Sequence, residues 1–196
     1  MSESVQDSGV SLHDIEALQH IDVRPDISLR PLQAGDASDV LSVLESDPSI
    51  RSRVTVAANM RNADDVARVV ADMEADPELI RYAICDQDNR CIGLVSFWLD
   101  SGFFGQVPMP NTYGFGYFVD LKERGKGIVP SSVSSIMGVA EKNIPGIEGF
   151  TAFCEDNNSE SIKVLESLGF KPTDSVYGEP DMGWPERQYV RGLNNE

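Results

Sequence analysis

The chain has 196 residues, of which 41% are hydrophobic and 24% are charged, so it is long enough to form one soluble domain with a buried core. With 16 Lys and Arg residues against 32 Asp and Glu residues, its formal net charge is −16. A negative field of this size disfavours nucleic acids and anionic membranes as partners, because both attract basic patches. The charge either favours a cationic, amine-bearing partner or only maintains solubility.

The cysteines are three, Cys85, Cys91 and Cys154. An odd number without the spacing of a metal site fits a reducing compartment, so neither a disulfide framework nor a bound metal is expected. No apolar run approaches the roughly 20 residues of a membrane-spanning helix, and the N-terminus carries acidic residues. We therefore expect a cytoplasmic protein that is a monomer or a homodimer.

Residues 1–26 are predicted to form an N-terminal extension that is partly mobile and contains a short helix. Ser11 caps a segment, residues 11–18, in which apolar residues recur at helical spacing. This helix either docks on the domain or covers it as a lid. His13 and His20 lie here, and solvated positions are favoured over a catalytic or metal-binding role because no Cys or Glu cluster completes a site.

The folded domain is expected to span residues 27–193. Its first strand, residues 27–32, alternates apolar and polar residues and contains Pro31, which favours the edge of a sheet. A short helix that ends before Asp47 follows, and a longer one begins near Asn62. Both helices carry an apolar face, so we expect them to pack over a sheet.

Two apolar runs, residues 81–86 and 91–99, are separated by a polar turn and predict an antiparallel hairpin. The Gly- and Pro-containing segment 100–110 is predicted to be a loop. Its Phe103 and Phe104 either line the mouth of a substrate site or pack the loop onto the domain.

A strand over residues 113–119 leads into a turn that reads Arg-Gly-Lys-Gly at residues 124–127, and a helix follows over residues 131–142. The N–H groups at a helix start lack intrahelical partners and attract anions. Glycines without a Cβ allow close approach to the backbone, and the two cations add charged donors. The segment is therefore either an anion site or an ordinary strand-to-helix connection.

Beyond this helix, residues 150–154 predict another strand, and Asn158 caps a helix that Gly169 ends. Two short strands are predicted near the C-terminus, over residues 175–177 and 187–191. Strands and helices therefore interleave along the chain, which predicts a mixed α/β layer structure.

Two segments resemble the acetyl-CoA signatures of the GCN5-related N-acetyltransferase (GNAT) superfamily. Residues 124–129, Arg-Gly-Lys-Gly-Ile-Val, resemble its pyrophosphate loop, and residues 158–170 resemble its later helix, Asn-x-x-Ser-x-x-Val-Leu-x-x-Leu-Gly-Phe. The Gly-Tyr-Phe-Val strand at residues 116–119 and the Leu-Arg-Pro start at residues 29–31 add to the pattern. Together they resemble most the ribosomal-protein-alanine acetyltransferase branch.

This resemblance implies a splayed, mainly antiparallel sheet flanked by helices, with acetyl-CoA as co-substrate between the strand that ends near Asp120 and the strand that ends near Glu155. It also implies that a primary amine, from a protein N-terminus or a small molecule, attacks the thioester directly. The residues that it places at acetyl-CoA are Phe118, Val119, Arg124, Gly125, Lys126, Gly127, Ile128, Val129, Asn158 and Ser161.

For catalysis, Ser161 is the candidate that protonates the departing thiolate, because Leu165 stands where many relatives carry a tyrosine for this role. Capping of its own helix is the other interpretation of Ser161. Gly114 stands where the branch often carries a glutamate. A general base must therefore come from Glu155, from Asp100 or from water.

The loop itself departs from the family pattern, because Val129 replaces a Gly or Ala and Pro130 has no N–H to offer a phosphate. This leaves open a second class of function, a GNAT-fold module that holds acyl-CoA without turnover. A third hypothesis is an interaction protein without a cofactor. The motifs do not specify the amine acceptor.

Overall fold

The strands of the computed structural model, which describes residues 11–102, 108–177 and 185–193, form one eight-stranded sheet in the order β1-β2-β3-β4-β5-β6-β8-β7. Neighbouring strands in it run antiparallel except β5 and β6, which are parallel. This confirms the predicted mixed, mainly antiparallel class. The strands are β1 (Ile21–Arg24), β2 (Ile27–Pro31), β3 (Leu79–Cys85), β4 (Cys91–Leu99), β5 (Thr112–Val119), β6 (Gly149–Glu155), β7 (Lys171–Tyr177) and β8 (Glu186–Gly192).

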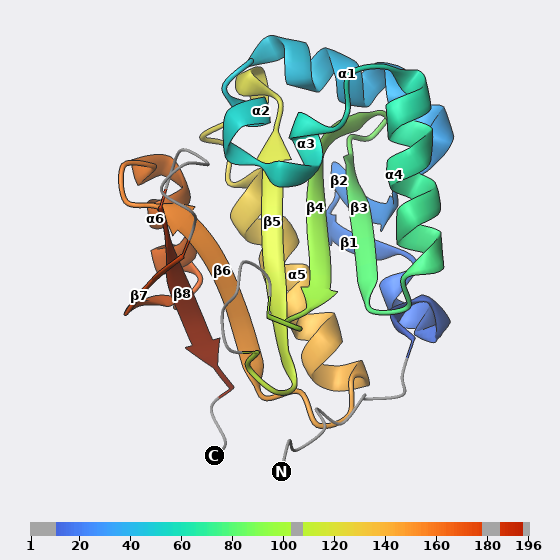
Figure 1. Cartoon of the computed structure of the whole chain (residues 1–196). Helices are drawn as coiled ribbons and strands as arrows, with labels where there is room; N and C mark the ends of the chain where they lie inside the picture. The colour runs from blue at the N-terminus through green and yellow to red at the C-terminus, as the bar shows by residue number, and fades with distance from the viewer. Residues whose placement is uncertain (1–10, 103–107, 178–184, 194–196) are drawn as a thin grey trace.

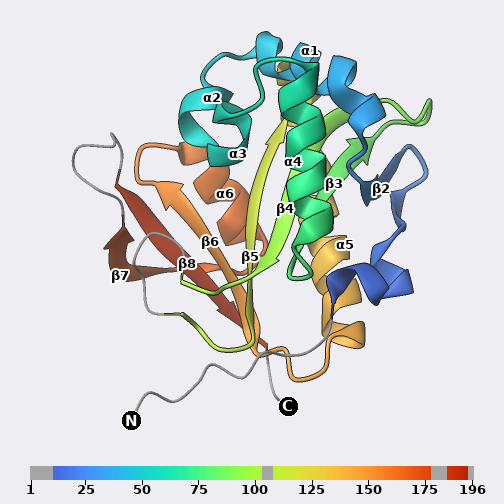
Figure 2. The same ribbon diagram turned by 45° about the vertical axis from the view of Figure 1, so that its right-hand side comes forward.

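Helices cover both faces of the sheet, as Figures 1 and 2 show. Those on one face are α1 (Ala37–Ser46), α2 (Ile50–Arg53), α3 (Thr55–Ala58) and α4 (Ala63–Ala75). Those on the other face are α5 (Ile128–Asn143) and α6 (Ser159–Ser167). Among the helices of the described residues, none has the length and hydrophobicity needed to cross a membrane.

The alternation of side chains along the strands gives each face its own apolar core. Beneath α1 to α4, alternate residues of β3 and β4, such as Ala83 and Leu94, pack with Val40, Val66 and the rest of the helices' inner faces. The core on the other face packs against α5 and contains Ile80, Tyr82, Val95, Phe97, Phe115, Phe150, Val133, Ile136 and Met137. The sheet is thus the middle of three layers, and alternate residues along each strand point to opposite faces of it.

β1 is a strand that the sequence did not predict, and it corrects the assignment of β2 as an edge strand. β1 pairs with β2 on the side opposite β3, and the pairing ends where Ile21 lies opposite Leu29. Pro31 lies just beyond that point, so its missing N–H costs no bond to β1. Pro31 therefore marks the end of β2 that has no partner in β1, and it does not mark β2 as an edge strand.

The N-terminal segment is docked on the domain. It forms two single-turn 3-10 helices, Leu12–Asp14 and Glu16–Leu18, and each buries a leucine in the core. His13 Nε2 lies 3.1 Å from the carbonyl oxygen of Met73 and 3.0 Å from that of Asp76, at the C-terminal end of α4. The expectation of a solvated His13 is therefore wrong, because the ring lies within hydrogen-bond distance of two backbone carbonyl oxygens at this end of the helix.

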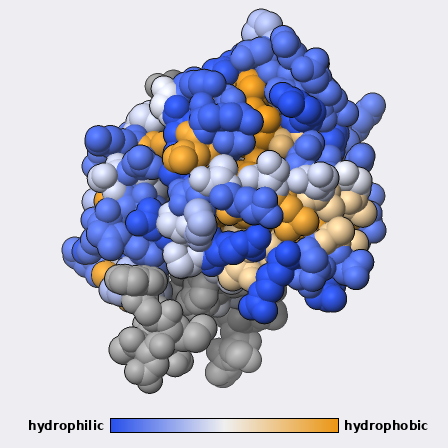
Figure 3. Space-filling model, turned by 90° about the horizontal axis from the view of Figure 1, so that it is seen from above, coloured by the Kyte–Doolittle hydropathy of each residue, from blue (hydrophilic) through white to orange (hydrophobic). Residues whose placement is uncertain are grey.

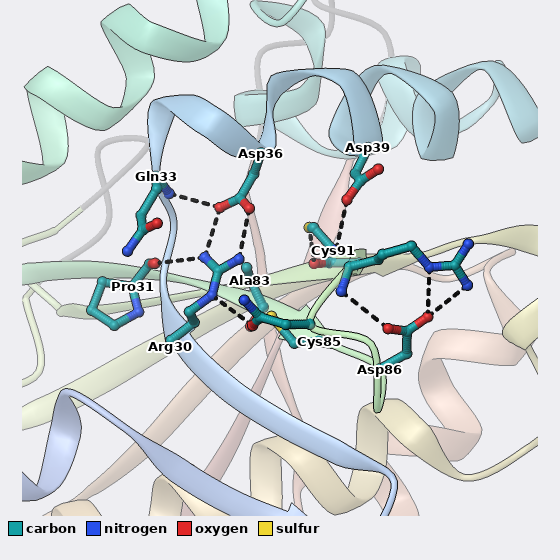
Figure 4. Close-up of polar contacts among 12 residues, drawn as sticks. Arg30, Pro31, Gln33, Asp36, Asp39, Ala83, Cys85, Asp86 and Cys91 are labelled. Atoms are coloured by element: carbon teal, nitrogen blue, oxygen red, sulfur yellow. Dashed lines mark hydrogen bonds and ion pairs between the residues drawn. The ribbon is translucent and has the colours of Figure 1, made fainter.

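The start of α1 is fastened to the sheet by a bidentate ion pair (Figure 4). Arg30 on β2 donates to both carboxylate oxygens of Asp36, at 2.8 and 2.7 Å. Burial alone would raise the pKa of Asp36, but the hydrogen bonds from Arg30 and from the Gln33 backbone hold it below its usual value. Asp39 adds a second tie, because it accepts a hydrogen bond from the backbone N–H of Cys91 at 3.0 Å. These contacts fix the helical layer that covers one side of the cleft described below.

Candidate active site

The central feature of the site is the gap between β5 and β6. The two strands pair only over Thr112–Phe115 and Gly149–Ala152. Beyond that point β5 remains paired with β4 and β6 with β8, but the two diverge from each other (Figure 1). The sheet is therefore splayed, as the family resemblance implied.

Backbone groups of β5 face this gap. Asp120 N donates to Ile92 O on β4 at 2.9 Å, and along an antiparallel ladder the direction of the backbone groups alternates. Phe118 therefore turns its N–H and C=O toward β4, whereas Tyr117 and Val119 turn theirs toward the gap. An extended ligand arm beside β5 would meet Tyr117 and Val119, rather than Phe118 and Val119 as expected from the motif.

The turn from β5 to α5 exposes a series of backbone donors. Gly125 and Gly127 both have φ of +73°, and nothing lies within 4 Å of a Cβ built on either. The first intrahelical bond runs from Ser131 N to Gly127 O at 3.1 Å. Among the described residues, none accepts a hydrogen bond from the N–H groups of residues 125–129. This open, donor-rich concavity fits a pyrophosphate.

The cations of the turn are engaged within the protein. Arg124 Nη2 lies 2.6 Å from Asp47 Oδ2, and its Nη1 lies 3.7 Å from a Glu160 carboxylate oxygen on α6. Lys126 Nζ lies 2.9 Å from Glu123 Oε2. An anion bound here would therefore rely mainly on the backbone donors, because both side-chain charges already have carboxylate partners.

A tyrosine and a serine meet near the gap. The hydroxyl of Tyr117 lies 2.7 Å from Ser161 Oγ, and burial raises the pKa of Tyr117. Ser161 stands in the first turn of α6, whose N-cap Asn158 accepts a hydrogen bond from Ser161 N at 3.2 Å. Leu165, one turn later, is buried. A phenolic hydroxyl is thus present although the helix lacks its tyrosine, and strand alternation in Gly-Tyr-Phe-Val is the signal that could have found it.

Trp98 occupies the space beside Gly114, the position at which the family resemblance implies a glutamate. A Cβ on Gly114 would lie 2.4 Å from Trp98 Cε2, and one on Gly116 would lie 3.6 Å from Trp98 Cζ3. The indole of this β4 residue therefore lies across both glycines. A glutamate at position 114 is incompatible with it.

Two glutamates lie opposite each other on β6 and β8. Glu155 is only 7% exposed, and its cross-strand partner is Glu186. Burial raises the pKa of Glu186 to about 7, and the charge of Glu155 adds to the shift. Sequence reasoning missed Glu186. Asp100, the other candidate base, lies beside Thr112 at the paired end of β5, away from these glutamates.

A cleft of about 780 Å³ joins these groups. Register places Trp98, Gly116, Glu155 and Glu186 toward the α1–α4 face, whereas Tyr117 belongs to the opposite face with α5 and α6. The cleft therefore connects the two faces through the gap. Seen from above, hydrophilic side chains surround apolar ones on this face of the molecule (Figure 3). Phe103 and Phe104, considered above for the mouth of a site, lie outside the described residues.

Comparison with known proteins agrees with this geometry. The family model of the acetyltransferase (GNAT) domain matches residues 26–171, so the chain belongs to the GNAT acetyltransferases. Members of this family transfer the acetyl group of acetyl-CoA to amines. The match confirms the predicted superfamily, the N-acetyltransferase class and acetyl-CoA as the co-substrate. Comparison with curated proteins gives no match.

Solved structures share the fold at low sequence identity. RimL, a ribosomal L7/L12 alpha-N-protein acetyltransferase in complex with coenzyme A, is 16% identical with a TM-score of 0.75, covering 90% of this chain and 99% of its own. The microcin C7 self-immunity acetyltransferase MccE, in complex with acetyl-CoA and AMP, is 17% identical with a TM-score of 0.71, covering 87% and 94%. A ribosomal-protein-S5-alanine acetyltransferase from Vibrio fischeri is 16% identical with a TM-score of 0.69, covering 88% and 96%. The suspected branch is thus represented among the similar folds.

Proposed function

We propose that this protein acetylates a primary amine that enters the cleft from the α1–α4 face, while acetyl-CoA lies on the α5–α6 side of the gap. The observation that carries this proposal is that groups able to accept or donate a proton lie on both sides of the gap between β5 and β6. The pair Glu155 and Glu186 lies toward the α1–α4 face, and the pair Tyr117 and Ser161 lies on the other. The amine must lose a proton and the thiolate must gain one, so the arrangement suits both transfers.

The described residues fit acetyl-CoA. The N–H groups of residues 125–129 would hold the pyrophosphate, and the gap-facing backbone of Tyr117 and Val119 would pair with the extended arm. When bound, acetyl-CoA supplies a thioester whose carbonyl carbon an amine can attack. Asn158 orders the first turn of α6 and so positions Ser161.

On the acceptor side, Glu186 is the proposed proton acceptor. A carboxyl whose pKa is about 7 is half deprotonated near neutral pH, and it can therefore accept a proton from an incoming ammonium. Glu155 assists because its charge helps to keep that pKa high. The Glu155 candidate thus becomes one member of a pair.

On the cofactor side, Ser161 is the proposed proton donor to the leaving thiolate. Its hydroxyl is within hydrogen-bond distance of the Tyr117 hydroxyl, so the serine can give up a proton and regain one from the phenol, which then takes a proton from water. Burial raises the pKa of Tyr117, so its hydroxyl stays protonated and can donate a hydrogen bond.

The acceptors considered are the N-terminus of a polypeptide and a small amine. RimL and the Vibrio fischeri protein are described as acting on ribosomal proteins. We propose a polypeptide N-terminus as the first acceptor to test. We also propose that the protein acts in the cytoplasm and that it is a monomer or a homodimer. The predicted division into residues 1–26 and 27–193 stays a proposal as well.

Two measurements test the proposed function in sequence. A thermal-shift titration with acetyl-CoA reports binding to the folded state. Such binding raises the free energy of unfolding by about 2.7 kcal/mol when the ligand concentration is a hundred times Kd. Thiol release with short peptides, polyamines and aminoglycosides then reports turnover. We expect a shift and amine-dependent thiol release, whereas no shift at millimolar acetyl-CoA would contradict the proposal.

A holding module without turnover is the second candidate function. It is favoured by Pro130, which removes one donor, and by the internal ion pairs of Arg124 and Lys126. A thermal shift without thiol release above hydrolysis for any amine would support it.

A further inference from the structure

Arg81 on β3 lines the cleft, and among the described residues no carboxylate lies within ion-pair distance of it. Its Nη1 donates to Val69 O on α4 at 3.3 Å, and it takes part in none of the ion pairs formed by the described residues. Its Nε is buried and, among those residues, finds no acceptor. This guanidinium is therefore not directly paired with a carboxylate, as most buried cations are.

The register places Arg81 in line with the gap. Arg81 lies opposite Ser96 on β4, and Ser96 lies opposite Gly116 on β5, so the three share the α1–α4 face in one row. Neighbouring strands are about 4.8 Å apart, which puts the Cα atoms of Arg81 and Gly116 about 10 Å apart. The two residues nearer the gap are small, and all three line the cleft.

The charged groups that act on Arg81 lie on α4 and just after its C-terminal end. Asp72 and Asp76 act on it electrostatically from a distance, while burial lowers its pKa. Arg68, the next arginine along the α4 wall, is already paired with Asp65 at 2.9 Å. Arg53 and Arg61 line the cleft from the helical layer, whereas Arg81 is the arginine that the strands β3, β4 and β5 contribute to it, with bonding capacity left for a ligand.

We propose that Arg81 binds a carboxylate on the acceptor, so that the substrate is an amine that carries a carboxylate roughly two strand spacings from its nitrogen. A guanidinium matches a carboxylate in shape and charge. The amine then lies at the gap between the two glutamates and Tyr117, with the carboxylate at the far end of the row. This inference rests on the proposed function and specifies its substrate class.

The same chemistry exists in two kinds of amine, an acidic side chain near a peptide N-terminus and a small amino acid with separated ends. The test uses both. One pair is an Ala-Ala-Asp peptide with an amidated C-terminus and its Ala-Ala-Asn counterpart. The other pair is aminohexanoate and its carboxamide. Whichever pair is discriminated identifies the source.

Transfer rates are measured for each pair with wild-type protein, Arg81→Gln and the matched control Arg68→Gln. Hydrogen bonds to a charged group predict that wild type prefers the carboxylate about 10- to 100-fold in kcat/KM. Arg81→Gln should lose this preference through a higher KM for the carboxylate, with its KM for acetyl-CoA unchanged, whereas Arg68→Gln should keep it.

The wild-type comparison alone can overturn the inference, so it does not depend on the variant folding. Equal kcat/KM for both members of both pairs would contradict the role of Arg81 and leave the proposed function intact. A preference that survives in Arg81→Gln would also contradict it. If no amine of any kind is acetylated, the proposed function fails, and the inference fails with it.

Discussion

The hydroxyl of Tyr117 lies 2.7 Å from Oγ of Ser161, which joins β5 to α6 near the gap where acetyl-CoA is proposed to bind. The two residues are 44 positions apart, and each comes from a different motif. The family resemblance implies a tyrosine on the helix itself, at the place of Leu165. Here the strand provides it, and the leucine at the usual place is buried.

This pairing predicts that Tyr117→Phe and Ser161→Ala each lower kcat about 100-fold, since a positioned proton donor contributes about that much or more. Because the two hydroxyls act as one unit, the double variant should be little worse than either single variant. Steady-state thiol release measures all three. Ser167→Ala, on the same helix, is the control and should be fully active. Simple multiplication of the two single effects would contradict a shared role.

The Glu155–Glu186 pair predicts a pH dependence. Glu186 must be deprotonated to accept a proton, so kcat/KM should rise with pH through about 7. In Glu186→Gln only the rise that belongs to the amine itself should remain, near pH 8 for a peptide N-terminus. Glu155→Gln should move the rise to lower pH. A pH profile that is the same in both variants as in wild type would exclude the pair.

The same titration affects stability. The pKa of Glu186 rises from 4.5 to about 7 on folding, so the folded state binds this proton more tightly than the unfolded chain does. The contribution of Glu186 to the free energy of unfolding is therefore fully present below pH 4.5 and is lost as the pH increases through 7. Urea unfolding at several pH values should show this decrease in wild type and not in Glu186→Gln. An identical pH dependence in both proteins would argue against the buried, protonated carboxyl.

Gly114→Ala should destabilise the fold by about 1–3 kcal/mol, because its Cβ would overlap Trp98. Combining it with Trp98→Leu should recover part of the loss. Gly138→Ala in α5, where nothing lies within 4 Å of the new Cβ, is the matched control and should be neutral or stabilising. Denaturant unfolding gives the comparison, and an unchanged midpoint for Gly114→Ala would show that Trp98 does not exclude a side chain there.

Pro130→Ala adds an N–H in the first turn of α5, where Pro130 follows Ile128 and Val129. It should tighten acetyl-CoA binding by about 1 kcal/mol if the new donor reaches the phosphates. Isothermal titration compares it with Pro145→Ala, beyond the other end of the helix. Unchanged or weaker affinity would show that this position does not face the pyrophosphate.

Local patterns were sufficient to predict most of the fold. The hairpin of β3 and β4, the helix starts at Asn62 and Asn158 and the glycine turn before α5 follow from side-chain alternation and short-range chemistry. The short helices α2 and α3 and the strand β1 were missed. Each has four residues, too few for a periodic pattern to be recognised.

The site was harder to predict because its groups meet through register. Glu186 becomes a candidate only once β8 lies beside β6, and the contact of Tyr117 with Ser161 exists only once α6 packs near β5. The tie between Arg124 and Asp47 likewise joins residues 77 positions apart. A motif can show which residue types are present, but a pKa of about 7 at Glu186 depends on burial and on Glu155.

The central claim is that an acetyl group passes from acetyl-CoA to an amine bound in the cleft. The most direct measurement is mass spectrometry of acceptor peptides after incubation with the protein and acetyl-CoA that carries an isotope-labelled acetyl group. We predict label on the N-terminal nitrogen of a peptide with wild-type protein and strongly reduced label with Ser161→Ala and with Glu186→Gln. Label on no amine from a folded protein that binds acetyl-CoA would contradict the account.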